Sequence, residues 1–278
     1  MPSFSFNHPG LANVRMNFAE EGTGNPPIVL IHGYGCAHAD WAHQVSSLST
    51  NYRTIAVDLP GHGASTRRVP GCRVEHLGDH VGALIENAGL EKAIIVGHSM
   101  GCRVAMQAAS YAPSRVAGVV LVDGSWIGQG DGAALEADAR SVFEQGGFHP
   151  TVARLFADMF LDASPNERAS DIIERAGTLD PDLGTGLFGS LVRWDAERLA
   201  AALTALKCAV TLVQSTYLNA DRKRVALTPG DTTPWLDLVR QRRPEAHIEL
   251  VYDVGHFTML EAPETVANVI REAAEAAA

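Results

Sequence analysis

The 278-residue chain has no long apolar run and no cluster of basic residues. Its longest apolar stretches, such as Ala117 to Val122, are far shorter than the roughly 20 residues that cross a bilayer. The formal net charge is −10, which disfavours binding to nucleic acid or to an anionic membrane surface. We therefore expect a globular protein that acts on a small molecule, with neither nucleic acid nor membrane as a partner.

Cysteine is also scarce, and no C-x-x-C pair occurs. The four cysteines are Cys36, Cys72, Cys102 and Cys208. Scattered cysteines in a chain of this length are typical of reduced thiols in a cytoplasmic protein. Residues 1–8 lack the basic and apolar regions of a secretory signal. Both observations predict a cytoplasmic location, and neither carries a signal of oligomeric state.

Short apolar segments rich in β-branched residues alternate with helical patterns. The expected strands are Ile28–Ile31, Thr54–Val57, Ala93–Val96, Gly118–Val122, Val210–Gln214 and Ile248–Tyr252. The expected helices are Trp41–Leu48, Val74–Ala88, Met100–Ser110, Trp235–Arg242 and Pro263–Ala276. Continuous apolar strands separated by helices predict an α/β fold, with a mainly parallel sheet covered by helices on both faces.

The strand signal disappears between Asp123 and about Lys207, where the pattern is helical and loop-like. We expect a core formed by residues 1–123 and 208–278, and a helical cap or lid formed by residues 124–207. Most of the cap's aromatic side chains should pack together, and a few should line an apolar pocket. These aromatic and large apolar residues are Trp126, Phe143, Phe148, Phe156, Met159, Phe160, Phe188 and Trp194.

The segment Gly97-His98-Ser99-Met100-Gly101 lies between an expected strand and an expected helix. A Gly-x-Ser-x-Gly pattern in this setting is typical of a nucleophile elbow, a strained turn that projects the serine from the sheet. Glycines on both sides let the strand and the helix approach closely. We therefore predict that Ser99 is a nucleophile. His98 is expected to pack against the sheet rather than to position another group.

A serine nucleophile needs a base and donors for the oxyanion. His256 follows the last expected strand and is the candidate base, whereas His247 lies at the opposite end of that strand. One oxyanion donor should be the backbone amide of Met100, at a helix N-terminus. The second should come from the loop His32-Gly33-Tyr34-Gly35, through the amide of Tyr34.

The acid that orients the histidine has two candidates. Asp123 ends the strand Gly118–Val122, and Asp221 lies in the loop that follows Val210–Gln214. An aspartate at the end of a strand is also a common turn or capping residue. From these residues alone the choice stays open.

These motifs resemble those of the α/β-hydrolase superfamily. The resemblance rests on the elbow, on His32-Gly33-Tyr34-Gly35, on the turn from Asp58 to Ser65 (Asp-Leu-Pro-Gly-His-Gly-Ala-Ser) and on Gly255-His256-Phe257. It implies an eight-stranded sheet, a helical cap after the sixth strand, and no cofactor or metal. The turn that contains Asp58 and His62 is mainly structural in this family.

The chain departs from the family pattern at the acid. Members commonly place it after the seventh strand in a Gly-x-x-Asp-like turn, but the segment Gln214 to Leu218 has neither residue at that offset. A minority place it after the sixth strand, where Asp123 stands, so we favour Asp123 over Asp221.

The resemblance and the serine together predict a hydrolase of esters or lactones of small to medium, mainly apolar substrates. It would act through an acyl-enzyme, with Ser99, His256 and Asp123 as the catalytic residues. The alternatives are a C–C bond hydrolase of dienone acids, a cofactor-free dioxygenase-like member, and a non-catalytic ligand-binding receptor on the same scaffold.

Overall fold

The computed structural model describes residues 3–8, 11–161 and 166–278. Its main sheet has eight strands in the order β1-β2-β4-β3-β5-β6-β7-β10. Six of them are mutually parallel: β3 (Ile28–Ile31), β4 (Thr54–Asp58), β5 (Ala93–His98), β6 (Val116–Val122), β7 (Ala209–Gln214) and β10 (His247–Leu250). These six are the strands that the apolar runs predict, with ends shifted by at most two residues.

Two antiparallel strands, β1 (Ser3–His8) and β2 (Leu11–Glu21), complete the sheet at one edge. Neither is among the strands read from the chain's apolar runs. In β2 the buried residues Val14, Met16 and Phe18 alternate with more polar neighbours. A strand that alternates in this way has no continuous apolar run, and this explains why it was missed.

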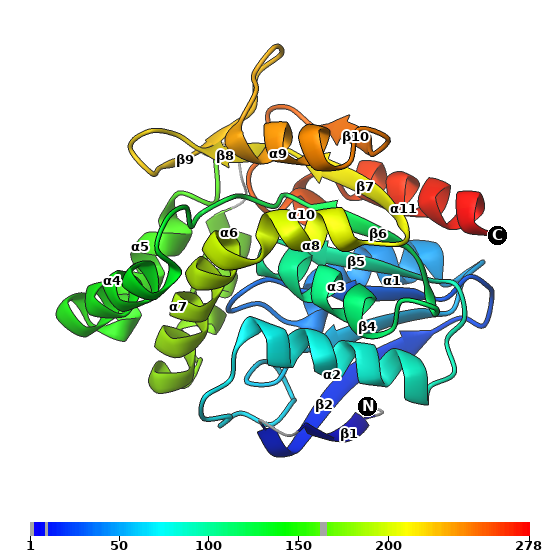
Figure 1. The fold of residues 1–278 in the computed structure, drawn as a ribbon, viewed down its shortest axis with the longest axis horizontal. Coiled ribbons are helices and arrows are strands. Elements are labelled where there is room, and N and C mark those ends of the chain that lie inside the picture. The colour runs from blue at the N-terminus through cyan, green and yellow to red at the C-terminus, as the bar shows by residue number, and fades with distance from the viewer. Residues whose placement is uncertain (1–2, 9–10, 162–165) are drawn as a thin grey trace.

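Helices cover both faces of the sheet, as expected (Figure 1). On one face α1 (Ala42–Leu48) packs against α11 (Pro263–Ala277), and α11 contacts β5, β6 and β7. On the other face lie α2 (Val74–Asn87), α3 (Met100–Tyr111), α8 (Leu199–Ala205) and α9 (Pro234–Arg242). The fold is therefore the predicted α/β arrangement.

Four helices between β6 and β7 gather at one end of the molecule (Figure 1). They are α4 (Gly132–Gly146), α5 (Phe148–Ala157), α6 (Asn166–Gly177) and α7 (Pro181–Glu197). Asp131 and Asp180 accept backbone N–H bonds at the starts of α4 and α7. Because α8 contacts the core helices α3 and α9, the cap boundary at residue 207 stays a prediction. No helix in the described ranges is both long and apolar enough to cross a membrane.

A short hairpin follows β7 and lies outside the main sheet. Its strands are β8 (Thr216–Leu218) and β9 (Arg224–Ala226), with Leu218 paired to Arg224. The connecting turn is fixed by the side-chain oxygen of Asn219, which accepts the N–H groups of Asp221 and Lys223. This hairpin occupies the loop in which most family members are expected to carry the acid.

Candidate active site

Ser99 occupies a strained turn between β5 and α3. Its backbone has φ +55° and ψ −114°, in a region that non-glycine residues seldom adopt. A Cβ added at Gly97 would lie 2.1 Å from the carbonyl oxygen of Gly101, and one at Gly101 would lie 2.6 Å from that of Ile31. Both neighbours are backbone atoms, so the close approach requires glycine at both positions.

The loop after β3 packs directly against this turn. A Cβ added at Gly33 would lie 3.2 Å from the Cβ of Ser99. The next residue, Tyr34, and the first residue of α3, Met100, supply the two backbone amides expected to face an oxyanion. Neither amide donates to a protein acceptor in the described part of the chain. Both N–H groups are therefore available to a ligand beside Ser99.

Two buried histidines hold this loop in place. His62 accepts the N–H of Gly35 at Nε2 (3.2 Å) and donates from Nδ1 to the carbonyl of Pro60 (3.1 Å). His32 accepts the N–H of Leu59 (3.0 Å) and donates to the carbonyl of Gly33 (2.7 Å). Each ring accepts and donates once, as only a neutral imidazole can. Burial lowers the pKa of His62 to about 4, consistent with a structural role for this turn.

His256 and Asp123 form a buried pair at the carboxyl ends of the strands. The Nδ1 atom of His256 lies 2.6 Å from Oδ2 of Asp123, and both side chains are almost fully buried. Asp123 has a φ of +44° directly after β6, which turns its carboxyl group toward the loop of His256. The carboxylate accepts the Nδ1–H, so Nε2 of His256 carries a free lone pair.

The ring of His98 fixes the backbone of that loop. Its Nε2–H donates to the carbonyl oxygen of His256 at 2.9 Å, and the two rings lie 4.7 Å apart. The expectation that His98 only packs against the sheet is therefore wrong, because its ring nitrogen reaches a backbone acceptor 158 positions away. Burial lowers the pKa of His98 to about 3, which keeps the ring neutral.

A dense set of donors surrounds the Asp123 carboxylate. Oδ1 accepts from the side chain of Gln214 (2.9 Å) and from the amides of Ser215 and Thr216 (both 2.8 Å). Oδ2 accepts from the hydroxyl of Thr216. That hydroxyl in turn accepts from Nη1 of Arg224 at 2.9 Å, so its own proton must point to Asp123.

The N–H donors around Oδ1 favour an ionised Asp123, because N–H groups cannot accept a proton from it. Burial raises the pKa of Asp123, while the charge of Arg224 and the hydrogen bonds from Thr216 and Ser215 oppose that rise. Nη1 of Arg224 lies 3.6 Å from Oδ2 of Asp123. The pKa of His256 is lowered by burial, then by the charges of Arg224 and Arg103, so the imidazole is neutral at pH 7.

The structure brings Ser99, His256 and Asp123 to one edge of the sheet, as the sequence predicts. Asp221 is instead exposed in the turn of the β8–β9 hairpin. Sequence reasoning missed Gln214, Thr216 and Arg224, which hold the carboxylate. The available signal was that the stretch from Gln214 to Leu218 contains no acid but several side chains that can donate hydrogen bonds.

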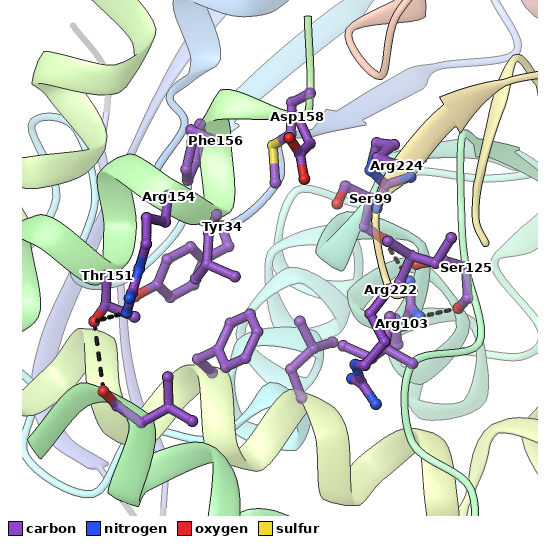
Figure 2. Close-up of a pocket in the computed structure, with 17 residues that line it drawn as sticks. Tyr34, Ser99, Arg103, Ser125, Thr151, Arg154, Phe156, Asp158, Arg222 and Arg224 are labelled. Carbon is purple, nitrogen blue, oxygen red and sulfur yellow. Dashed lines mark hydrogen bonds between the residues drawn. The ribbon is translucent and has the colours of Figure 1, made fainter. Parts of the chain in front are cut away.

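A cavity of about 420 Å³ opens beside Ser99. Figure 2 shows Ser99 near Arg224, Ser125, Arg222 and Arg103 on one side, while Tyr34, Phe156, Thr151 and Arg154 lie opposite. The remaining lining residues are Ile127, Val142, Leu155, Asp158, Met159, Phe188, Leu191 and Leu218. The cavity is thus enclosed by the core, by helices α4, α5 and α7, and by the hairpin.

Of the aromatic and large apolar residues between β6 and β7, some pack against one another and others line the cavity. Phe156, Phe188 and Met159 line the cavity. Phe143 stacks on Phe148 at 5.8 Å, and Trp194 is buried in α7. The pocket is less apolar than the sequence predicts, because arginines from α3, α5 and the hairpin also reach it.

Arg103 is committed to a buried ion pair. Its guanidinium donates to both carboxylate oxygens of Asp195 in α7 (2.8 and 2.7 Å) and to the carbonyl of Ser99 (2.9 Å). The side chains of Arg103 and Asp195 are 2% and 0% exposed. The pair joins the elbow helix to the cap, and it offsets the charge of this arginine inside the cavity wall.

Comparison with known proteins identifies the family of this chain. A sequence model of the alpha/beta hydrolase family matches residues 28–269. The chain therefore belongs to the alpha/beta hydrolase family.

Three curated relatives show how far the similarity extends. The dihydrolipoyllysine-residue acetyltransferase component of the acetoin cleaving system of Cupriavidus necator is 34% identical over 182 residues, which cover 63% of this chain and 48% of that protein. The chain thus matches about half the length of that relative, and 37% of the corresponding component from Pseudomonas putida. The pimeloyl-[acyl-carrier protein] methyl ester esterase of Nitrosomonas europaea is 27% identical over 260 residues, covering 88% of this chain and 94% of that one.

Solved structures share the fold. A thermophilic esterase from Thermogutta terrifontis superposes with a TM-score of 0.81 and 22% identity, covering 100% of this chain and 99% of that one. The enol-lactonase of Burkholderia xenovorans LB400 superposes with a TM-score of 0.74 and 21% identity, covering 94% and 96% of the two chains. At these identities the likeness concerns the fold alone.

Proposed function

We propose that this enzyme hydrolyses carboxylic esters or lactones through an acyl-enzyme, with Ser99 as nucleophile, His256 as base and Asp123 as the orienting acid. The observation that carries the proposal is the buried hydrogen bond of 2.6 Å between Asp123 and Nδ1 of His256. It leaves Nε2 of a neutral imidazole to accept a proton at the serine elbow.

In the acylation step, His256 removes the proton of the Ser99 hydroxyl as its oxygen bonds to the substrate carbonyl. The carbonyl π electrons move to oxygen, and the amides of Tyr34 and Met100 stabilise that oxyanion. Collapse of the intermediate breaks the bond to the alcohol oxygen, which takes its proton from the His256 imidazolium. Asp123 holds the tautomer and stabilises the imidazolium without accepting the proton itself.

In the deacylation step, water attacks the acyl carbonyl and loses a proton to His256. The Ser99 oxygen then leaves and recovers that proton, which regenerates the free enzyme. The cavity enclosed by the cap gives an acyl or alcohol group room beside Ser99. The named activity of the relative from Nitrosomonas europaea, a methyl ester esterase, supports an ester as the bond cleaved.

The test uses 4-nitrophenyl esters of increasing acyl length with wild-type, Ser99→Ala and Ser110→Ala proteins. Ser110 is an exposed serine of the same helix and is the matched control. We expect Ser99→Ala to lose nearly all turnover and Ser110→Ala to retain it. Intact-mass spectrometry after treatment with a fluorophosphonate should find one adduct on the wild type and none on Ser99→Ala. Turnover by Ser99→Ala within a few-fold of wild type would overturn the proposal.

The same preparation separates the alternatives. Cleavage of a dienone acid without ester turnover would assign the C–C hydrolase reaction. Oxygen consumption without an added cofactor would assign the dioxygenase-like reaction. Tight ligand binding with neither turnover nor a covalent adduct would assign a receptor.

A further inference from the structure

The wall of the cavity next to Ser99 is positively charged, although the whole chain carries a net charge of −10. Arg103, Arg154, Arg222 and Arg224 line the cavity. Among the described lining residues, Asp158 is the single acidic one. An isolated cluster of one sign in a protein of the opposite sign indicates a ligand that complements it.

The arginines differ in how far the protein neutralises them. Arg103 has a full partner in Asp195. Arg224 lies beside Asp123, but the nearest oxygen of that carboxylate is 3.6 Å away and the carboxylate already accepts the Nδ1–H of His256. In the described part of the chain, no carboxylate forms an ion pair with Arg222. Arg154, on the opposite wall in α5, also has no carboxylate partner among the described residues. On the Ser99 side of the cavity, the incompletely neutralised cations are therefore those of the hairpin (Figure 2).

Arg224 is placed rigidly for binding. Its side chain is 8% exposed, and it projects from β9 directly opposite Leu218, another residue that lines the cavity. Nη1 donates to the hydroxyl of Thr216, and in the described residues no protein acceptor takes its other N–H groups. Because Arg224 lines the cavity next to Ser99, these groups face the space that a substrate would fill (Figure 2).

Arg222 adds a second cation on the same side of the hairpin. Both Arg222, in the turn, and Arg224, in β9, line the cavity. The turn holds Arg222 at φ +59°, through the hydrogen bond of its amide to the carbonyl of Asn219 (2.9 Å). The hairpin thus presents a fixed guanidinium near Ser99 and an exposed one beyond it.

We propose that the substrate carries a carboxylate group close to the bond that is cleaved, and that Arg224 and Arg222 bind this carboxylate. The planar guanidinium fork matches the geometry of a carboxylate. The rest of the substrate would pack against Tyr34, Phe156 and Phe188 on the opposite side of the cavity. This inference rests on the proposed hydrolysis at Ser99, and it replaces a mainly apolar substrate with an anionic one.

Arg224 could instead serve only to hold Asp123, and the two roles predict different kinetics. A residue that only positions Asp123 would affect neutral and anionic substrates by the same factor. A residue that binds a carboxylate would change the ratio between them. The decisive quantity is therefore the selectivity ratio, defined as kcat/KM for an anionic ester divided by kcat/KM for its neutral analogue.

The first experiment compares 4-nitrophenyl hydrogen glutarate with 4-nitrophenyl pentanoate, which have acyl groups of equal carbon number. We expect a selectivity ratio above one for the wild type, falling about ten- to hundred-fold in Arg224→Gln, the usual effect of losing a hydrogen bond to a charged group. Arg222→Gln should lower it less, because that side chain is exposed. Arg240→Gln, an exposed change in α9, should leave it unchanged.

The second pair moves the anion to the alcohol side. Carboxymethyl butanoate and ethyl butanoate, followed by pH-stat titration, test whether the arginines bind the leaving group rather than the acyl group. A ratio above one that depends on Arg224 in either pair supports the proposal and identifies the side. Ratios at or below one in both pairs, or equal losses for anionic and neutral esters in Arg224→Gln, would overturn it.

A binding measurement keeps this inference separate from the proposed reaction. Calorimetry with monomethyl glutarate should detect binding to Ser99→Ala protein, and about ten-fold weaker binding or none to the Ser99→Ala, Arg224→Gln double variant. If no ester is hydrolysed but this difference is found, the hydrolase proposal fails and the carboxylate site stands. If neutral esters are hydrolysed and the difference is absent, the hydrolase stands and the carboxylate site fails.

Discussion

Replacing Asp123 with asparagine tests the proposed catalytic acid, which follows β6 instead of the more common position after β7. The side chain keeps its size and shape, so the effect comes from one changed charge and one changed atom type. In the wild type, Oδ1 accepts from Gln214, Ser215 and Thr216, while Oδ2 accepts from Thr216 and His256.

These donors determine how the asparagine must sit. Its amide nitrogen cannot occupy the Oδ1 position, because it would face three N–H groups with no acceptor among them. The amide oxygen therefore takes that position, and the NH₂ group faces His256. There it donates to Nδ1, which forces the proton of the imidazole onto Nε2. The base then has no lone pair to receive the proton of Ser99.

The same change of tautomer in serine proteases lowers kcat about ten-thousand-fold. We expect a loss of about 10³ to 10⁴ here, equivalent to about 4 to 5 kcal/mol in the activation barrier. The three hydrogen bonds to the amide oxygen remain, so the variant should fold with an unchanged circular dichroism spectrum. The assay is kcat/KM for a neutral 4-nitrophenyl ester at pH 7.5.

Asp221→Asn is the matched control, because Asp221 is the other acid considered and is exposed in the hairpin turn. We expect its activity to stay within about two-fold of wild type. If Asp123→Asn were nearly as active as wild type while Asp221→Asn abolished turnover, the assignment of the acid would be refuted.

Three further substitutions test how residues around the candidate site contribute to the stability of the fold. Gly101→Ala should lower the free energy of unfolding by about 2 to 3 kcal/mol in urea titrations, because its Cβ would lie 2.6 Å from a backbone oxygen. Gly186→Ala is the control, because its Cβ would meet nothing closer than 3.5 Å, and equal effects of the two changes would contradict the packing argument. Arg103→Met should lower the free energy of unfolding by about 3 to 5 kcal/mol in the same titrations, because it leaves the Asp195 carboxylate buried without its cation. A decrease below about 1 kcal/mol would show that the ion pair is not needed for stability. Burial lowers the pKa of His98 to about 3, so below pH 6.5 the unfolded state binds a proton at this residue that the folded state does not. His98 alone should therefore lower the free energy of unfolding by up to about 1.4 kcal/mol per pH unit as the pH falls from 6 to 4, and His98→Gln should reduce the measured slope by that amount; an unchanged slope would contradict the argument.

Much of the fold could be predicted because five of the six parallel strands, β3 to β7, are almost entirely buried on both faces, while β10 at the sheet edge is half-buried. Burial on both faces leaves a continuous apolar run, which is visible in the sequence without any partner. The strand β2 and the hairpin β8–β9 leave no such run. Their pairing depends on residues distant in the chain, such as the contact of β2 with β4, and local patterns do not encode it.

The same contrast between local patterns and distant contacts applies to the residues of the candidate site. Ser99 and its glycines could be predicted because the strain of the elbow is local and only certain residues tolerate it. His98 could not be assigned its contact, because the acceptor is the backbone of His256. A backbone carbonyl has no signature in the sequence. Arg224 was missed for a related reason, since an arginine in a polar loop is ordinarily a solvated surface residue.

The position of the acid follows from the order of the strands. Because β6 and β7 are parallel neighbours, their carboxyl ends open on the same edge, and a carboxylate after either one can face the loop of His256. A carboxylate after β6 is buried, however, and needs donors to remain ionised. In this chain the segment after β7 supplies them, through the side chain of Gln214 and the amides of Ser215 and Thr216.

The same hairpin then returns through β9 and carries Arg224 to the cavity. An acid after β7 would leave this segment less free to supply the donors, since it would itself need partners. Moving the acid to β6 therefore releases the loop after β7 for two tasks, holding Asp123 and presenting cations to the substrate. On this argument the departure from the family pattern and the charge of the cavity have one structural origin.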